Sequence, residues 1–185
     1  MAAIDNAFAA RTTEGAVYEE LDKWGQSPVE QRLARAAAVR RLSAPELEEH
    51  TEHTLTRFAP LLEPNPRAMK RLLNAYGVER AVQILEGHPR DLEHPRDTLA
   101  LWVVLKSRWP LLADYLASNP HTISDIAKGS VPTELADDSR GYLLALFRDM
   151  TVRRVVNGDG LDARLDERSL SLLLNGAPAE DTMFE

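Results

Sequence analysis

Apolar residues recur along most of the chain at intervals of three and four, which is the spacing of one face of an α-helix. The clearest case begins at Asn65, where Met69, Leu72, Leu73 and Tyr76 share one face. The pattern predicts helices over residues 17–24, 28–42, 45–62, 66–86, 96–108, 111–117, 122–128, 138–156 and 166–174. Residues 1–14 show weak periodicity and are expected to fray, and residues 130–137 are expected to form a loop.

Serine, asparagine and proline mark where several of these helices start. Ser27 to Glu30 reads Ser-Pro-Val-Glu, which combines a capping serine, a proline at the first helical position and a glutamate three residues after the cap. Ser43 and Asn65 stand shortly before a proline in the same way, so we expect both to cap helices. Pro60 should bend or end the helix in which it lies.

Composition supports an all-α fold. The chain has 27 Leu and 24 Ala but only 11 Val and 4 Ile, so strong helix formers far outnumber β-branched residues. We expect an irregular bundle of about eight to ten helices, with the nearly all-apolar helix 96–108 and its Trp102 at the centre of the second half. The predicted organisation is a frayed end (1–14), a helical subdomain (15–86), a proline-rich connector (87–95), a second helical subdomain (96–175) and a mobile tail (176–185).

Charge and hydropathy limit the function. The 22 basic and 29 acidic residues give a net charge of −7, which disfavours nucleic acid and anionic lipid as partners. The longest apolar run, Leu99 to Leu105, is too short for a membrane span, and the first residues lack the pattern of a secretory signal. We therefore expect a cytoplasmic protein without a membrane span. Because the chain has no cysteine, disulfides, thiolate metal clusters and cysteine nucleophiles are excluded.

Three motifs resemble metal sites but depart from the known spacings. His50 and His53 lie among glutamates, but not as H-E-x-x-H, so we interpret them as part of a solvated acidic face. The tetrapeptide His-Pro-Arg-Asp occurs at 88–91 and 94–97, where it is typical of turns and helix starts. Residues 157–162 lack an acid that a calcium loop requires, so we predict a plain turn there.

The helix that follows Asn65 has a cationic face. Each of the four apolar positions has a polar residue two positions before it: Arg67, Lys70, Arg71 and Asn74. A shift of two residues places these side chains roughly opposite the apolar face of the helix. The first turn of a helix has unpaired N–H groups and the positive end of the macrodipole, an arrangement suited to a phosphate. The same residues also fit a solvated basic face on a packed helix.

Residues 65–76, NPRAMKRLLNAY, resemble the asparagine-proline-arginine helix that follows the ATPase core in KAP family P-loop NTPases. In that family the N-P-R-x-x-K-R-x-x-N pattern is similar to the sensor 2 region of AAA-type ATPases. Residues 100–116, ALWVVLKSRWPLLADYL, are similar to the helical tail of bacterial members. The resemblance covers roughly residues 28–120.

The resemblance implies a role for each cationic residue. Arg67 would be the sensor arginine that reaches a γ-phosphate, Lys70 and Arg71 would support it, and Asn74 would orient the helix. The chain lacks the family's phosphate-binding loop and metal-binding acidic strand, so ATP and magnesium are expected only where an NTPase core supplies them. Alone, the chain should bind no cofactor and have no ATPase activity. The alternative is a free-standing helical interaction module whose cationic helix binds an acidic protein partner.

Overall fold

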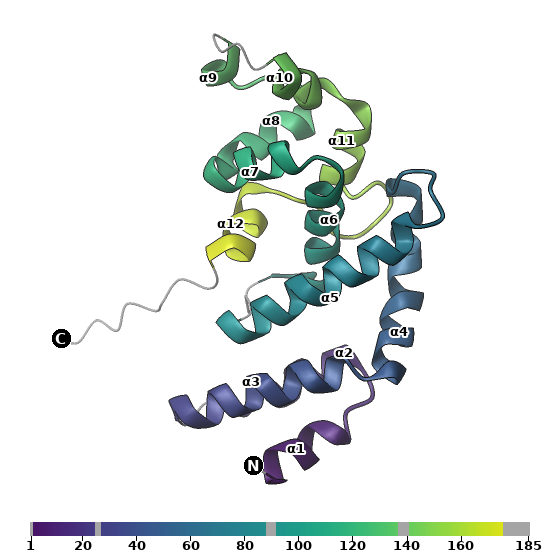
Figure 1. The fold of residues 1–185 in the computed structure, drawn as a ribbon. Helices are drawn as coiled ribbons and strands as arrows, with labels where there is room; N and C mark the ends of the chain where they lie inside the picture. Colours follow the sequence, from purple (N-terminus) through teal and green to yellow (C-terminus); the bar gives the residue numbers. More distant parts are fainter. Residues whose placement is uncertain (1, 25–26, 88–91, 137–140, 176–185) are drawn as a thin grey trace, which may run out of the picture.

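The structure, a computed structural model, describes residues 2–24, 27–87, 92–136 and 141–175. Every regular element in these residues is helical, which confirms the predicted all-α class and irregular bundle (Figure 1). The α-helices are α1 (Ala2–Ala9), α2 (Glu14–Leu21), α3 (Pro28–Leu42), α4 (Pro45–Leu55), α5 (Ala68–Glu86), α6 (Pro95–Arg108), α7 (Pro110–Ser118), α8 (Ile123–Lys128), α9 (Thr133–Ala136), α10 (Gly141–Arg148), α11 (Met150–Val156) and α12 (Glu167–Asn175). Two 3-10 helices, η1 (Thr56–Leu61) and η2 (Pro120–Thr122), join them, and the helices outnumber the eight to ten expected.

The larger of two apolar clusters surrounds α6. All seven residues from Leu99 to Leu105 are buried, which confirms that this helix is central, and Trp102 is 5% exposed. The end of α4, the first half of α5 and the helices from α7 to α12 pack around it. No helix in the described part of the chain is both long and apolar enough to cross a membrane.

The smaller apolar cluster contains the N-terminal helices, where the expectation of a frayed end is wrong. Residues 2–9 form α1, whose Ile4 and Phe8 are buried against α3. The matching surface on α3 is built of alanines, Ala34, Ala37 and Ala38, which allow close approach. This contact is tertiary, so local periodicity in residues 1–14 could not reveal it.

The two clusters do not follow the boundary that we predicted at residues 87–95. Helix α5 contributes Leu72 and Tyr76 to the larger cluster and Ile84 to the smaller one. The division between cores therefore runs through α5, and the predicted first subdomain shares its core with the second. Residues 88–91 of the connector and the predicted tail lie outside the described residues.

Helix starts agree with the sequence only in part. Ser27 caps α3 as predicted, since its Oγ accepts a hydrogen bond from Glu30 N at 3.2 Å. Ser43 does not cap α4, because its Oγ donates to the carbonyl of Val39 and Ala44 takes the cap position. Pro60 lies in η1, where the helix tightens after the end of α4, as expected.

The helix predicted to run as far as Val156 is divided in two. Asp149 ends α10 and caps α11, since its Oδ1 accepts from Thr151 N at 2.6 Å and Val152 N at 3.2 Å. A short polar side chain can offer the backbone such an alternative to a continuous helix. The loop expected at 130–137 contains the single-turn helix α9, and the predicted cap at Asp137 or Asp138 lies outside the described residues.

The turn predicted at residues 157–162 is present. Gly158 and Gly160 have φ angles of +74° and +92°, and Asp159 has a φ of +26°. A Cβ added to Gly158 would lie 1.9 Å from the carbonyl oxygen of Ala163, so only glycine fits that position. Arg154 holds the turn through an ion pair with Asp159.

Candidate functional site

The segment that leads into α5 differs in detail from the predicted cap. The Oδ1 of Asn65 accepts a hydrogen bond from Arg67 N at 2.9 Å, which closes a turn over Pro66. The helix begins afterwards at Ala68, and Arg67 occupies the N-cap position. Asn65 therefore does not cap the helix and Pro66 precedes it, because an asparagine side chain can close its own turn with the backbone two residues later.

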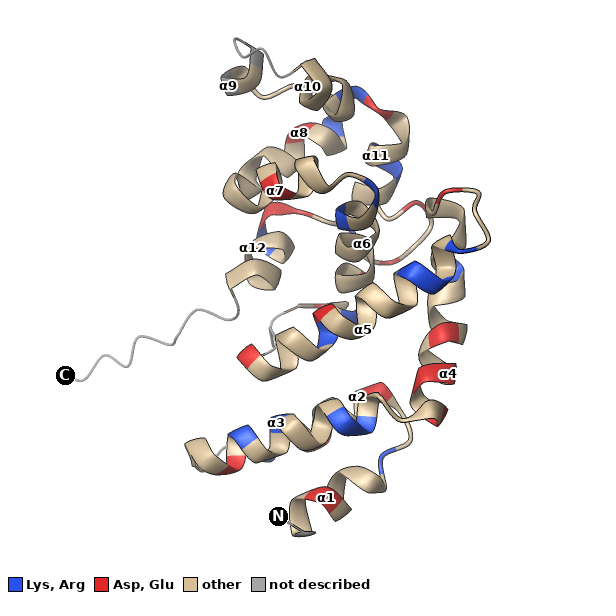
Figure 2. Ribbon diagram, in the orientation of Figure 1, with Lys and Arg blue, Asp and Glu red and all other residues tan. Residues whose placement is uncertain are grey.

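Three cations, which we call the cationic turn, lie on the surface at the start of α5: Arg67, Lys70 and Arg71. Figure 2 shows this basic end of α5 in blue. Arg67, Lys70, Arg71 and Asn74 are all exposed, as predicted. Arg71 forms an exposed ion pair with Glu63 at 3.2 Å, whereas Arg67 and Lys70 have no ion pair among the described residues. The turn therefore has cationic groups available to a ligand outside the chain.

The opposite face of α5 fixes the helix in the core. Leu72 and Tyr76 are buried, as predicted, while Met69 is only partly buried. The segment before the helix is held as well, because Arg108 donates to the carbonyl of Leu61. The cationic turn is therefore attached to a well-packed part of the larger cluster.

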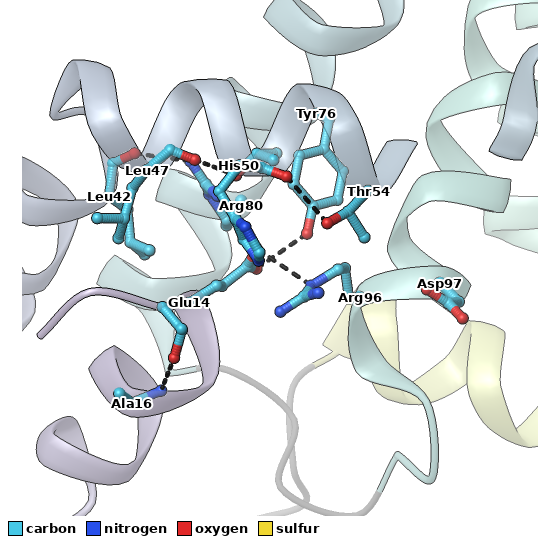
Figure 3. Close-up of polar contacts among 12 residues, drawn as sticks. Glu14, Ala16, Leu42, Leu47, His50, Thr54, Tyr76, Arg80, Arg96 and Asp97 are labelled. Atoms are coloured by element: carbon cyan, nitrogen blue, oxygen red, sulfur yellow. Dashed lines mark hydrogen bonds and ion pairs between the residues drawn. The ribbon is translucent and has the colours of Figure 1, made fainter. Parts of the chain in front are cut away.

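Further along α5, a buried carboxylate connects this helix to two other helices (Figure 3). Glu14 of α2 is 2% exposed. Its Oε1 accepts a hydrogen bond from the Tyr76 hydroxyl at 2.9 Å. Its Oε2 lies 3.3 Å from Arg80 Nη1 and 3.2 Å from Arg96 Nε. Glu14 thus joins α2 to α5 and α6, and we call Glu14, Tyr76, Arg80 and Arg96 the Glu14 network.

Arg80 extends the Glu14 network to two further helices. Its Nη1 lies 3.2 Å from Thr51 Oγ1 of α4, and its Nη2 donates to the carbonyl of Leu42 of α3 at 3.1 Å. Burial raises the pKa of Tyr76 well above its usual value, and the negative charge of Glu14 raises it further. Tyr76 therefore stays neutral and keeps the proton that it donates to Glu14.

A groove of about 850 Å³ runs between α4 and α5, next to the cationic turn. Glu48 and Glu52 of α4 lie on one side, and Lys70 and Asn74 of α5 lie on the other. Residues of the Glu14 network, Tyr76 and Arg80, form part of its floor. A ligand that enters the groove therefore meets two glutamates on the side of α4 and one lysine on the side of α5.

The structure describes His50, His53, the second His-Pro-Arg-Asp and residues 157–162 of the motifs that resembled metal sites. Among the described residues, no group of three histidine, aspartate or glutamate side chains is placed to hold a metal ion. His50 and His53 are exposed on α4 among exposed glutamates, as expected of a solvated face. In the second His-Pro-Arg-Asp, Pro95 starts α6 and Arg96 and Asp97 form ion pairs with Glu14 and Arg57. The first copy lies outside the described residues.

Sequence reasoning missed the Glu14 network. A signal was present, since Arg80 follows Leu72 and Tyr76 at intervals of four residues and so shares their buried face. An arginine on an apolar face is expected to have a buried counter-charge. The partner, Glu14, lies 66 residues away in the sequence and could not be identified from it.

Comparison of the chain with family models, curated proteins and solved structures finds no match. The relationship to KAP family NTPases therefore stays a prediction that rests on residues 65–76 and 100–116.

The positions of Arg67 and Leu72 predict opposite effects on stability. Arg67 is an exposed cation at the positive end of a helix dipole, so Arg67→Ala should leave the free energy of unfolding unchanged or raise it by about 0.3–1 kcal/mol. Leu72 is 2% exposed, so Leu72→Ala should lower it by about 2–5 kcal/mol. Equilibrium urea unfolding measures both values. Equal destabilisation by the two changes would contradict the separation of an exposed cationic face from a core face.

Proposed function

We propose that this chain is the helical lid-like portion of a KAP-type P-loop NTPase and that it contributes Arg67 to an ATP site completed by an NTPase core. The observation that carries the proposal is the cationic turn, in which Arg67 and Lys70 are exposed and have no ion pair among the described residues. The resemblance of residues 65–76 to the sensor 2-like helix of that family supports the same residues.

Binding of an anion would explain why cations lie at the start of α5, whereas the stability of the fold does not explain it. A cation beside the N-terminus of a helix opposes the macrodipole by about 0.3–1 kcal/mol at an exposed position. An anion bound at the turn would interact favourably with both the dipole and the guanidinium. A phosphate is such an anion, and the planar guanidinium of Arg67 can bind two of its oxygens.

The residues of this chain determine which roles we assign to it and which to the NTPase core. Arg67 would contact the γ-phosphate, Lys70 and Arg71 would add positive charge beside it, and Asn74 would orient the helix. Magnesium would be held by the core, since the described residues of this chain offer no set of three metal-ligating side chains. Stabilisation of charge in the transition state by Arg67 is therefore the only chemistry that we assign to the chain.

The first test is the genomic neighbourhood of the coding sequence. We expect a P-loop NTPase core to be encoded in the same or an adjoining reading frame. Its absence there would contradict the proposal.

The second test is ATP hydrolysis by the core together with this chain. Arg67→Ala should lower the turnover rate by about 10²–10³-fold, the usual cost of removing one group that stabilises a developing negative charge. Arg148→Ala is the matched control, because Arg148 is an exposed arginine on α10 and should leave turnover unchanged. The isolated chain should show no hydrolysis. Unchanged turnover in the Arg67 variant, or hydrolysis by the isolated chain that depends on Arg67, would overturn the proposal.

A further inference from the structure

Beyond the cationic turn, the outward face of α5 is apolar. Val78, Val82 and Leu85 are 63%, 41% and 51% exposed. We call these three residues the α5 seam. Their spacing of four and three residues is that of the a and d positions of a coiled coil. The same alternation of four and three residues extends back from Val78 to Ala75 and Arg71. Arg71 of the cationic turn therefore lies on the same face of α5 as the α5 seam.

Among the described residues, no contact accounts for the α5 seam. On its core side, α5 contributes Leu72, Tyr76 and Ile84 to the two clusters. These contacts would be unchanged if polar residues replaced the α5 seam on the outer side. Helix propensity does not explain the two exposed valines either, since β-branched residues are poorer helix formers than Ala, Glu or Lys. Exposed apolar side chains that lie next to one another on one face of a helix are typical of a surface that another molecule covers.

We propose that the α5 seam, together with Lys70 and Arg71 of the cationic turn, docks one amphipathic helix of a partner protein. Its apolar residues would pack on Val78, Val82 and Leu85, and its acidic residues would face Lys70 and Arg71. The alternating spacing of the seam favours a helix as the occupant, because helices pair through residues at that interval. The cations at one end of the seam favour carboxylates at the matching end of the partner.

The size and surroundings of the surface fit a helix. From Arg71 to Leu85 the docking face is roughly 21 Å long at 1.5 Å per residue. Val78 also lines the α4–α5 groove, so the seam and the groove are continuous. Beside it, a Cβ built on Gly77 would meet nothing within 4 Å, which leaves space for a partner helix to approach closely. Across the groove, Glu48 and Glu52 favour a basic residue on the side of the partner that faces α4.

This inference does not rest on the proposed function. Carboxylates of the partner would face Lys70 and Arg71, and Arg67 would stay available to a phosphate. An NTPase core is one protein that could provide the helix. Variants distinguish docking from nucleotide sensing, because Val82→Asp alters only the α5 seam and Arg67→Ala alters only the sensor arginine, whereas Lys70 and Arg71 would contribute to both.

A synthetic peptide tests the docking surface on the full chain. The probe is a fluorescent helical 21-residue peptide with leucine at its a and d positions and glutamates at the end that meets the cationic turn. Fluorescence anisotropy measures its dissociation constant. Val82→Asp should weaken binding by tenfold or more, a loss equivalent to about 1.4 kcal/mol. Leu111→Asp is the matched control, because Leu111 is 61% exposed on α7 and should leave binding unchanged.

Charge reversal tests the orientation of the bound peptide along α5. Lys70→Glu combined with Arg71→Glu should weaken binding of the glutamate peptide, and a peptide with lysines in place of those glutamates should restore it. Circular dichroism checks that each variant keeps the fold. Absence of saturable binding, equal loss in the Leu111 variant, or failure of the lysine peptide to rescue would overturn the inference. So would sedimentation showing a dimer of the unmodified chain that Val82→Asp dissociates, since the occupant would then be a second copy.

Discussion

Glu14→Ala should lower the free energy of unfolding by about 3–5 kcal/mol, because it removes the carboxylate that faces the buried Arg80. The Arg80 side chain is 5% exposed, so water cannot replace the lost partner. The same change removes the acceptor of the Tyr76 hydroxyl hydrogen bond. Equilibrium urea unfolding followed by far-ultraviolet circular dichroism measures the loss.

Two controls separate a lost charge pair from general damage to α2. Glu19→Ala changes an exposed glutamate of the same helix and should alter the free energy of unfolding by less than about 0.5 kcal/mol. Tyr76→Phe removes one hydrogen bond to Glu14 but no charge, and it should cost about 0.5–1.5 kcal/mol. If Glu14→Ala cost no more than Tyr76→Phe, the ion pair between Glu14 and Arg80 would have no special role in stability.

Trp102→Ala should also lower the free energy of unfolding by about 3–5 kcal/mol, since it leaves a large cavity in the centre of the larger cluster. Trp102 is 5% exposed and its neighbours along α6 are buried on all sides, so the surroundings can collapse only partly. Thermal and urea unfolding measure the change. Trp24→Ala is the control, because Trp24 is only partly buried and should cost less. A loss as small as that of Trp24→Ala would show that Trp102 is not a core residue.

Much of the fold follows from local patterns. The apolar positions around Trp102 predict the central helix, and Ser27 with its proline and glutamate predicts a helix start that the structure confirms. These features depend on residues within a few positions of each other. Helix α1 was missed, because an eight-residue helix has little stability of its own and forms here through its contact with α3.

The candidate site was predictable to a similar extent. Exposure of Arg67, Lys70 and Arg71 follows from their position opposite Leu72 and Tyr76 on one helix. The Glu14 network was not predictable, because its members are brought together from α2, α5 and α6. The α5 seam was not predictable either. Periodicity identifies Val78, Val82 and Leu85 as apolar positions of a helix, but only the tertiary structure shows that they are exposed where the structure describes the chain.

The Glu14 network also affects how parts of the molecule can open. The N-terminal helices contain the smaller cluster, which has fewer buried apolar residues than the larger one. On apolar burial alone, these helices would be the first region to detach and exchange their amide protons with solvent. Detachment of α2 removes Glu14 from Arg80 and Arg96, which then lack their counter-charge. That electrostatic cost is added to the loss of apolar contacts in the partly open state. The network therefore couples the opening of the small cluster to that of the large one, so that the described helices favour unfolding as one cooperative unit.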